Sequence, residues 1–154
     1  MIELDEDKIE SKNLSLKLFL VLLRATTSIT KRVEEDIKTY GLNTTEFGVL
    51  ELLYHKGDHP IQKIGEKILL ASSSITYVVD KLEKKELLVR KPCEEDRRII
   101  YTSITEKGKS LMNEIFPKHT IEVEKLFSVL SNEEKEEMIK TLKILGHTTA
   151  TRIL

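Results

Sequence analysis

The sequence predicts a mainly α-helical protein with one small β-hairpin, and three observations favour this fold class. Apolar residues recur at helical spacing over most of the chain, from Leu14 to Leu145. Two strand-like runs, residues 87–91 and 99–104, flank a polar loop. Of the 154 residues, 40% are hydrophobic and 33% are charged, which is typical of one domain with a sizeable core and much exposed helix surface.

The N-terminal half predicts three helices. A long helix is expected from Leu14 to Tyr40, where apolar residues form one stripe. Asn43-Thr44-Thr45-Glu46 resembles a capping box and starts a second helix. Residues 57–60 (Gly-Asp-His-Pro) predict a turn, and residues 61–68 predict a short third helix, the first half of a helix-turn-helix.

Residues 71–85 carry the most informative pattern. Ile75, Val78, Val79 and Leu82 are spaced to form one face of a fourth helix. The opposite face carries hydroxyl and charged side chains: Ser73, Thr76, Tyr77, Asp80, Lys81 and Lys84. Hydroxyl groups bond base edges or phosphates and lysines neutralise phosphates, so this face suits a helix in the major groove of DNA.

The strand-like runs follow this helix and enclose a loop that ends in Arg97-Arg98. A helix followed by a basic-tipped hairpin is the layout of a winged helix-turn-helix. Thr105 then starts a fifth helix, which Pro117 either kinks or restarts. Ser131-Asn132-Glu133-Glu134 is a capping box for the last helix.

The chain resembles the MarR family of bacterial transcription regulators from about Leu14 to about Leu145. The family's wing signature is Asp, any residue, Arg, five residues, Leu-Thr, two residues, Gly. This sequence has Asp96, Arg98, Ile104-Thr105 and Gly108 at those spacings, with Ile in place of Leu. Residues 74–83 fit the family's recognition helix. Glu86 departs from the pattern because a Gly commonly ends that helix, so a slightly different helix-to-strand corner is expected.

The resemblance implies one MarR-type domain over residues 1–154. Residues 43–104 would form the winged helix-turn-helix lobe, and residues 11–42 and 105–152 would form dimerisation helices. The terminal helices carry more apolar surface than such a lobe can cover, which also favours a second subunit. A symmetric homodimer would present two recognition helices about one DNA turn apart and read a palindromic operator in double-stranded DNA.

The expected DNA contacts come from the fourth helix and the hairpin. They are Ser72, Ser73, Ser74, Thr76, Tyr77, Lys81, Lys84, Arg90, Lys91, Arg97 and Arg98. In the family interpretation Arg98 enters the minor groove, where negative potential favours arginine, and Asp96 orients it through a charge-assisted bond. Arg90, Lys91 and Arg97 are phosphate contacts or supports. Asp80, which phosphates would repel, is expected to pair locally, for example with Lys84 at i+4.

The alternative for both segments is a solvated polar surface without DNA. The formal net charge of −1 favours that alternative, because DNA affinity depends on neutralising phosphates. The distribution of charge favours DNA: residues 72–109 hold nine Lys/Arg against seven Asp/Glu, a balance of +2, whereas the ends of the chain are acidic.

In the family, ligands that release DNA are often aromatic and bind between the first, second and fifth helices. A small phenolic or quinone-like compound is therefore expected here, with an oxidant as the alternative. The pocket residues proposed on this basis are Phe19, Leu23, Phe47, Leu50 and Phe116, although core packing explains them equally well. Cys93 is the one possible redox residue, and it is expected to be a bystander because the chain has no second Cys to resolve an oxidised thiol.

Other functional classes find little support. His55 and His59 are four residues apart, but Gly57 and Asp58 interrupt any helix between them, so no metal site is expected. No catalytic triad or phosphate loop is present, so neither an enzyme nor a cofactor is expected. A cytoplasmic protein is expected, because no apolar run suits a membrane span or a secretory signal. The competing class is a winged-helix module that binds protein instead of DNA.

Overall fold

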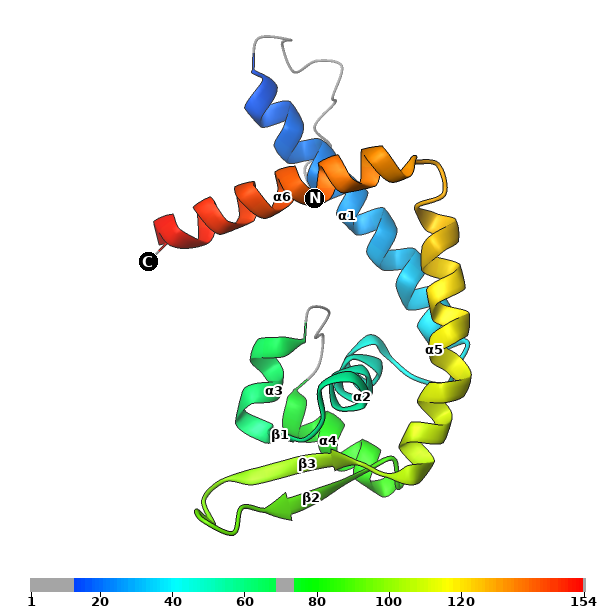
Figure 1. Cartoon of the computed structure of the whole chain (residues 1–154), viewed down its shortest axis with the longest axis vertical. Helices are drawn as coiled ribbons and strands as arrows, with labels where there is room; N and C mark the ends of the chain where they lie inside the picture. The colour runs from blue at the N-terminus through cyan, green and yellow to red at the C-terminus, as the bar shows by residue number, and fades with distance from the viewer. Residues whose placement is uncertain (1–12, 69–73, 154) are drawn as a thin grey trace. The chain divides into compact units, whose positions relative to one another are not determined.

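The computed structural model describes residues 13–68 and 74–153. The elements in chain order are α1 Leu14–Lys38, α2 Thr44–Lys56, β1 His59–Pro60, α3 Ile61–Lys67, α4 Ile75–Lys84, β2 Leu88–Pro92, β3 Ile100–Ile104, α5 Glu106–Leu126 and α6 Asn132–Ile153 (Figure 1). The predicted fold class is confirmed: the chain is mainly helical with one small antiparallel sheet. Within the described ranges, no helix is both long enough and apolar enough to cross a membrane.

The chain divides into two compact units between Thr120 and Ile121. The first contains α1 to α4, the sheet and most of α5, and therefore the whole winged helix-turn-helix. The second contains the end of α5 and all of α6. In the second unit Ser131 starts α6 as predicted: its hydroxyl accepts from the Glu134 N–H at 3.1 Å, and its own N–H donates to the Glu134 carboxylate at 2.8 Å.

The sheet has the strand order β1-β3-β2, and both pairs are antiparallel. The β2–β3 hairpin places Arg90 opposite Thr102. On the other side of β3, His59 lies opposite Thr102, whose hydroxyl donates to the His59 carbonyl at 2.9 Å. The prediction that residues 57–60 form only a turn was wrong, because a two-residue strand is too short to show an alternating pattern. Pro60 fits this position because an edge strand tolerates a missing N–H.

The core of the first unit lies between α2, α4, β2 and α5. The apolar face predicted for the recognition helix is confirmed, since Val78, Val79 and Leu82 are fully buried. They pack with Leu50, Leu53, Ile64, Leu88 and Met112. α5 continues through Pro117 to Leu126, so of the two alternatives for this proline, a kink or a restart, the restart is excluded.

The corner between α4 and β2 keeps a left-handed residue despite the missing glycine. Glu86 has φ of +61°, the one positive φ of a non-glycine residue in the described ranges. Its N–H donates to the Glu83 carbonyl at 2.9 Å, and the Leu87 N–H donates to the Leu82 carbonyl at 3.0 Å. This is the Schellman arrangement that usually ends in glycine. Glu86 therefore adopts the conformation that a glycine would take there, and the expected difference at the corner is not found.

Thr105 and Gly108, at the start of α5, pack against this corner. The Thr105 hydroxyl donates to the Glu86 carbonyl at 2.7 Å and accepts from the Gly108 N–H at 3.0 Å. A Cβ atom on Gly108 would lie 2.2 Å from the Leu87 carbonyl oxygen, so only glycine allows this approach. The Thr and Gly of the wing signature thus have a packing role at this corner.

Candidate nucleic-acid interface and ligand cavity

Some of the residues predicted to contact DNA lie on the exposed face of α4. Ser72 and Ser73 lie outside the described residues, while Ser74, Thr76, Tyr77 and Lys84 are exposed. Tyr77 is 64% exposed although it is a large aromatic residue. The α4 helix forms here because its opposite face is buried in the core, which fixes these side chains toward solvent.

Lys81 does not project freely from this face, because it binds a buried carboxylate. Its Nζ lies 3.1 Å from Glu46 Oε1, and Lys85 Nζ lies 2.9 Å from Glu46 Oε2. The side chain of Glu46 is only 2% exposed. Burial raises the pKa of the Glu46 carboxyl, but the hydrogen bonds from Lys85 and Lys81 outweigh burial and leave the pKa below its ordinary value. The hydrogen bond to Glu46 also raises the pKa of Lys81.

These contacts also correct the capping box predicted at the start of α2. Asn43 Oδ1 accepts from the Glu46 N–H at 2.8 Å, as a cap should. The Glu46 carboxylate, however, turns to the lysines instead of reaching back to Asn43. Only half of the box is formed, because a buried carboxylate gains more from two ammonium groups than from one backbone N–H.

Arg90 joins the wing to the recognition helix. Its guanidinium binds the Asp80 carboxylate and, at 2.8 Å, Glu83 Oε1, while its backbone N–H donates to Glu83 Oε2 at 3.1 Å. Asp80 is therefore paired as expected, but with Arg90 and not with Lys84, the example given by the i+4 spacing, because the strand brings a planar donor to the carboxylate. The pKa of Arg90 is raised by the hydrogen bond to Asp80 and then by that to Glu83, against the effect of burial. This geometry favours the support alternative for Arg90.

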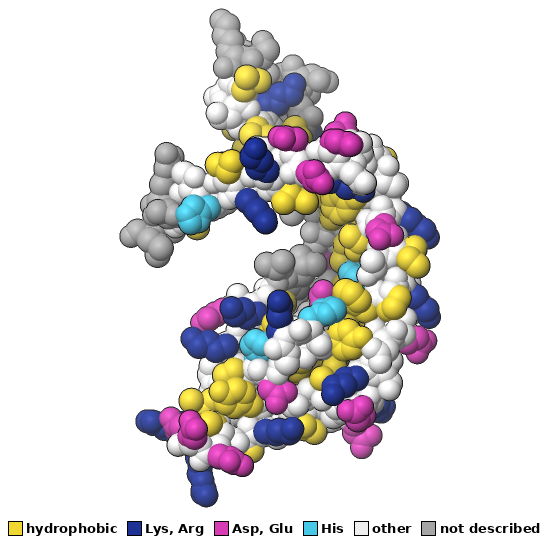
Figure 2. Space-filling model, in the orientation of Figure 1, with side chains coloured by type: hydrophobic (Ala, Val, Ile, Leu, Met, Phe, Trp, Pro, Cys, Tyr) yellow, Lys and Arg dark blue, Asp and Glu magenta, His cyan; other side chains and the backbone are white. Residues whose placement is uncertain are grey.

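The tip of the wing presents Arg98. Its Nε and terminal nitrogen donate to the two oxygens of Asp96, each at 3.1 Å, and its N–H donates to Asp96 Oδ1 at 3.1 Å. These bonds lower the pKa of Asp96, yet the Arg98 side chain is 90% exposed. Lys91 and Arg97 are also exposed, and basic and acidic side chains are intermixed at this end of the molecule (Figure 2).

Cys93 lies at the base of the wing turn and is half-buried. Its N–H donates to the Ile99 carbonyl at 2.9 Å, which closes the turn. Cys93 therefore belongs to the loop that holds Arg98, and the described part of the chain holds no group of side chains that could bind a metal ion.

A cavity of about 470 Å³ opens between α1, α2, the end of α3 and α5. Its lining residues are Val33, Ile37, Thr44, Phe47, Gly48, Glu51, Leu52, His55, Lys56, Lys67, Ile68 and His119. Of the five predicted pocket residues, only Phe47 is among them. Leu50 is fully buried in the core, and the centroid of the Phe116 ring lies 4.5 Å from that of the His55 ring. Phe19 and Leu23, on α1, are about half exposed.

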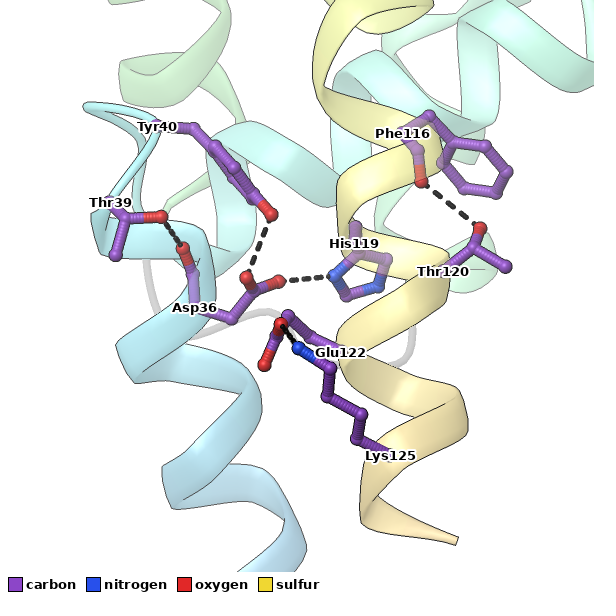
Figure 3. A network of polar contacts seen from close by, with 8 residues as sticks. All are labelled: Asp36, Thr39, Tyr40, Phe116, His119, Thr120, Glu122 and Lys125. Atoms are coloured by element: carbon purple, nitrogen blue, oxygen red, sulfur yellow. Dashed lines mark hydrogen bonds and ion pairs between the residues drawn. The ribbon is translucent and has the colours of Figure 1, made fainter. Parts of the chain in front are cut away.

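No local pattern in the sequence predicts His119, one of several polar residues that line this cavity. Its Nδ1 lies 2.7 Å from Asp36 Oδ2, and Tyr40 donates its hydroxyl to Asp36 Oδ1 at 2.7 Å (Figure 3). The His119 ring lies 4.7 Å from the Phe47 ring in a tilted arrangement. Asp36 and His119 are 83 positions apart, so no local pattern signals their contact. An apolar cavity with a fixed imidazole and an aromatic ring suits a small aromatic compound with polar substituents.

Comparisons with known proteins agree with this architecture. A model of the MarR family matches residues 42–100. The HTH-type transcriptional regulator MhqR of Bacillus subtilis (strain 168) is 60% identical over 132 residues, which cover 86% of this chain and 91% of that protein. Among solved structures, AbsC, a MarR family regulator from Streptomyces coelicolor, superposes with a TM-score of 0.78 at 23% identity and covers 87% of this chain and 93% of its own. Sco3205 from the same organism, solved in complex with DNA, has a TM-score of 0.76 at 18% identity, with coverage of 86% and 88%.

Proposed function

The chain belongs to the MarR family, and we propose that it is a homodimeric repressor that leaves a palindromic operator when it binds a small phenolic or quinone-like compound. As a member of that family it is a DNA-binding transcriptional regulator and not an enzyme. Since its target is the genome, we place its action in the cytoplasm. We treat residues 1–154 as one functional domain, with residues 43–104 as the DNA-reading lobe.

The observation that carries the DNA-binding proposal is the exposed Arg98 fork at the wing tip, in the same unit as the polar face of α4. Arg98 would enter the minor groove while Ser74, Thr76 and Tyr77 face base edges in the major groove. Lys84, Lys91 and Arg97 are exposed and would neutralise phosphates. Lys81 and Arg90 already bind carboxylates, so we assign them to holding α4 and the wing in place.

The dimer proposal is supported separately by each unit. In the first unit α1 exposes large apolar side chains, among them Leu14, Leu18 and Phe19. In the second unit α6 exposes a further set: Met138, Ile139, Leu142, Ile144 and Leu145. A second copy of the chain would bury both surfaces, as the family's terminal helices do.

The ligand proposal is supported by the cavity between α1, α2 and α5. Its volume exceeds that of one aromatic ring, and the rings of Phe47 and His119 are part of its lining. A phenolic hydroxyl would find hydrogen-bonding partners in His119 and Glu51, which line the same space. An oxidant acting at Cys93 remains the alternative inducer, at a place that does not line the cavity.

The experiment that tests this proposal is an operator-release assay. An operator is first found by footprinting the protein on its host's genome, and its affinity is then measured by fluorescence anisotropy with and without hydroquinone. We expect hydroquinone to weaken binding of the wild type, and to act less on His119→Ala than on the wild type. If the protein bound no duplex DNA specifically, that result would instead favour the alternative function, a winged-helix module that binds protein.

A further inference from the structure

Glu46 lies in the first turn of α2, between residues that face the ligand cavity. Thr44, Phe47 and Gly48 line that cavity, whereas Glu46 does not. Successive residues of a helix point about 100° apart, so the same turn presents Phe47 to the cavity and Glu46 to α4. Phe47, in the cavity wall, therefore follows directly after Glu46, which contacts the recognition helix.

The Glu46 carboxylate has both of its ion pairs with the C-terminal part of the recognition helix. Lys81 belongs to α4 and Lys85 is the residue that caps it. The distances are 3.1 Å to Lys81 and 2.9 Å to Lys85, with the Glu46 side chain only 2% exposed. A buried carboxylate is costly without its partners, so these two contacts tie the position of α4 to that of the α2 turn.

We propose that Glu46 is a positioning residue for DNA binding, through which an occupant of the cavity shifts the recognition helix. This inference rests on the proposed function, because it takes the cavity as the inducer site. It adds the route by which an occupied cavity changes the helix that reads DNA.

The route follows from the stiffness of the helix turn. A guest that presses on Phe47 and Thr44 moves the first turn of α2 as one body, and the Glu46 carboxylate moves with it. Both ion pairs are short and their carboxylate is buried, so when it moves the lysines and the end of α4 must follow or lose their partner. Either outcome changes the fit of α4 in the major groove.

Glu46 also limits how two positive charges act on DNA. Its single carboxylate cancels one of the two lysine charges and holds both ammonium groups at its own oxygens. Removing the carboxylate would free them for nonspecific phosphate contacts. Loss of Glu46 should therefore uncouple the cavity from the operator and at the same time strengthen binding to random DNA, which a purely structural defect would not do.

The test is a double-mutant cycle in the full-length protein that needs no ligand. Val33 lines the cavity from α1, so Val33→Phe fills part of it as a guest would. Operator and scrambled duplexes are titrated at several salt concentrations with the wild type, Val33→Phe, Glu46→Gln and the double variant. Glu83→Gln is the matched control, because it removes a carboxylate from a cation on the same lobe without touching the cavity-lining turn.

We expect Val33→Phe to weaken operator binding about tenfold when Glu46 is present, and less than about twofold in the Glu46→Gln background. The tenfold effect should persist in Glu83→Gln. For scrambled DNA, Glu46→Gln should steepen the salt dependence by up to about 0.9 for each lysine set free. A Val33→Phe effect that is equal in both backgrounds, or absent from the wild type, would overturn the inference.

Thermal melting monitors whether each variant folds. If Glu46→Gln does not fold, Lys85→Gln takes its place, since it removes one of the two contacts and should reduce the Val33→Phe effect to about threefold; an undiminished effect counts against the route. Hydroquinone titrations separate this inference from the proposed function. Release of the wild type and of Glu46→Gln at equal hydroquinone concentrations leaves the ligand proposal standing and refutes the role of Glu46. The opposite result is also informative. If the Val33→Phe effect disappears in the Glu46→Gln background while hydroquinone never releases the wild type, the role of Glu46 is supported and the ligand proposal is refuted.

Discussion

Asp96 holds the Arg98 guanidinium by two parallel hydrogen bonds of 3.1 Å while leaving 90% of the arginine side chain exposed. The guanidinium is thus fixed in direction before it meets any partner. An arginine that is already ordered loses less conformational entropy on binding, which is the advantage of a preorganised contact. The pair is therefore suited to inserting a charged side chain into a narrow groove.

Removing either member of this pair should weaken operator binding. Arg98→Ala is expected to cost about 1–3 kcal/mol per half-site if it reads the minor groove. Asp96→Asn should cost less, since the arginine stays but loses its fixed direction. Arg98→Lys serves as the control, because it keeps the charge without the planar fork. Fluorescence anisotropy on operator duplexes measures all three, and an Arg98→Ala variant that binds like the wild type would refute the wing assignment.

Lys84 should behave differently from Arg98, because it is expected to touch only phosphates. Lys84→Ala should weaken operator and scrambled DNA by similar factors and lower the salt slope by about one unit. The measurement is the affinity for both duplexes over a range of salt concentrations. If Lys84→Ala weakened only the operator, Lys84 would have to be a base-reading residue instead.

Gly108 should be indispensable for stability. A methyl group there meets the Leu87 backbone carbonyl at 2.2 Å, which no side-chain rotation relieves. Gly108→Ala should lower the free energy of unfolding by about 1–3 kcal/mol or more, measured by urea denaturation. Gly146→Ala is the matched control: nothing lies within 4 Å of its Cβ position in α6, so it should be neutral or stabilising. Equal effects of the two substitutions would contradict the packing at Gly108.

Stability should depend on acid pH through Glu46. Its pKa is lowered from the ordinary value of 4.5, so its ion pairs stabilise the native state above pH 4.5 and are lost as pH falls through the lowered native value. Lys81, whose pKa is raised from 10.5, loses its contribution only in alkali. The free energy of unfolding of the wild type should therefore fall more steeply below pH 4.5 than that of Glu46→Gln. Parallel curves for the two proteins would contradict this account of the buried carboxylate.

The apolar face of α6 should be required for assembly. The double substitution Leu142→Glu and Leu145→Glu puts charged side chains at two positions where exposed apolar side chains lie in the single chain. It should shift the protein toward monomer in sedimentation velocity, because burying these charges in an interface is costly. Lys140→Glu, also on α6 but at a polar position, is the control and should leave the dimer intact. An unchanged dimer in the double variant would exclude this face from the interface.

Sequence patterns predicted α4 and the hairpin because a helical face and a spaced signature are local features. Val78, Val79 and Leu82 are buried as their spacing indicates. The strand β1 was not predicted because two residues are too few to show alternating apolar and polar side chains. Its hydrogen-bonding partner, β3, lies more than forty positions away in the sequence.

The contacts between distant segments could not be predicted in the same way. Glu46 looked like half of a capping box, since nothing near it in the sequence shows that Lys81, 35 positions later, offers a better partner. His119 and Asp36 meet across 83 positions. The pocket prediction for Phe19 and Leu23 of α1 rests on the family resemblance, because periodicity identifies an apolar face without showing whether core, cavity or a second subunit covers it. Phe19 illustrates this, being exposed on α1 and absent from the cavity wall.

Specific DNA recognition by α4 and the wing can be measured as the ratio of wild-type affinities for operator and scrambled duplexes at one physiological salt concentration. We expect the protein to bind the operator at least about 10³-fold more tightly than the scrambled duplex, as other specific regulators do. We also expect Arg98→Ala to remove a large part of that ratio. Equal affinities of the wild type for the two duplexes would contradict specific recognition.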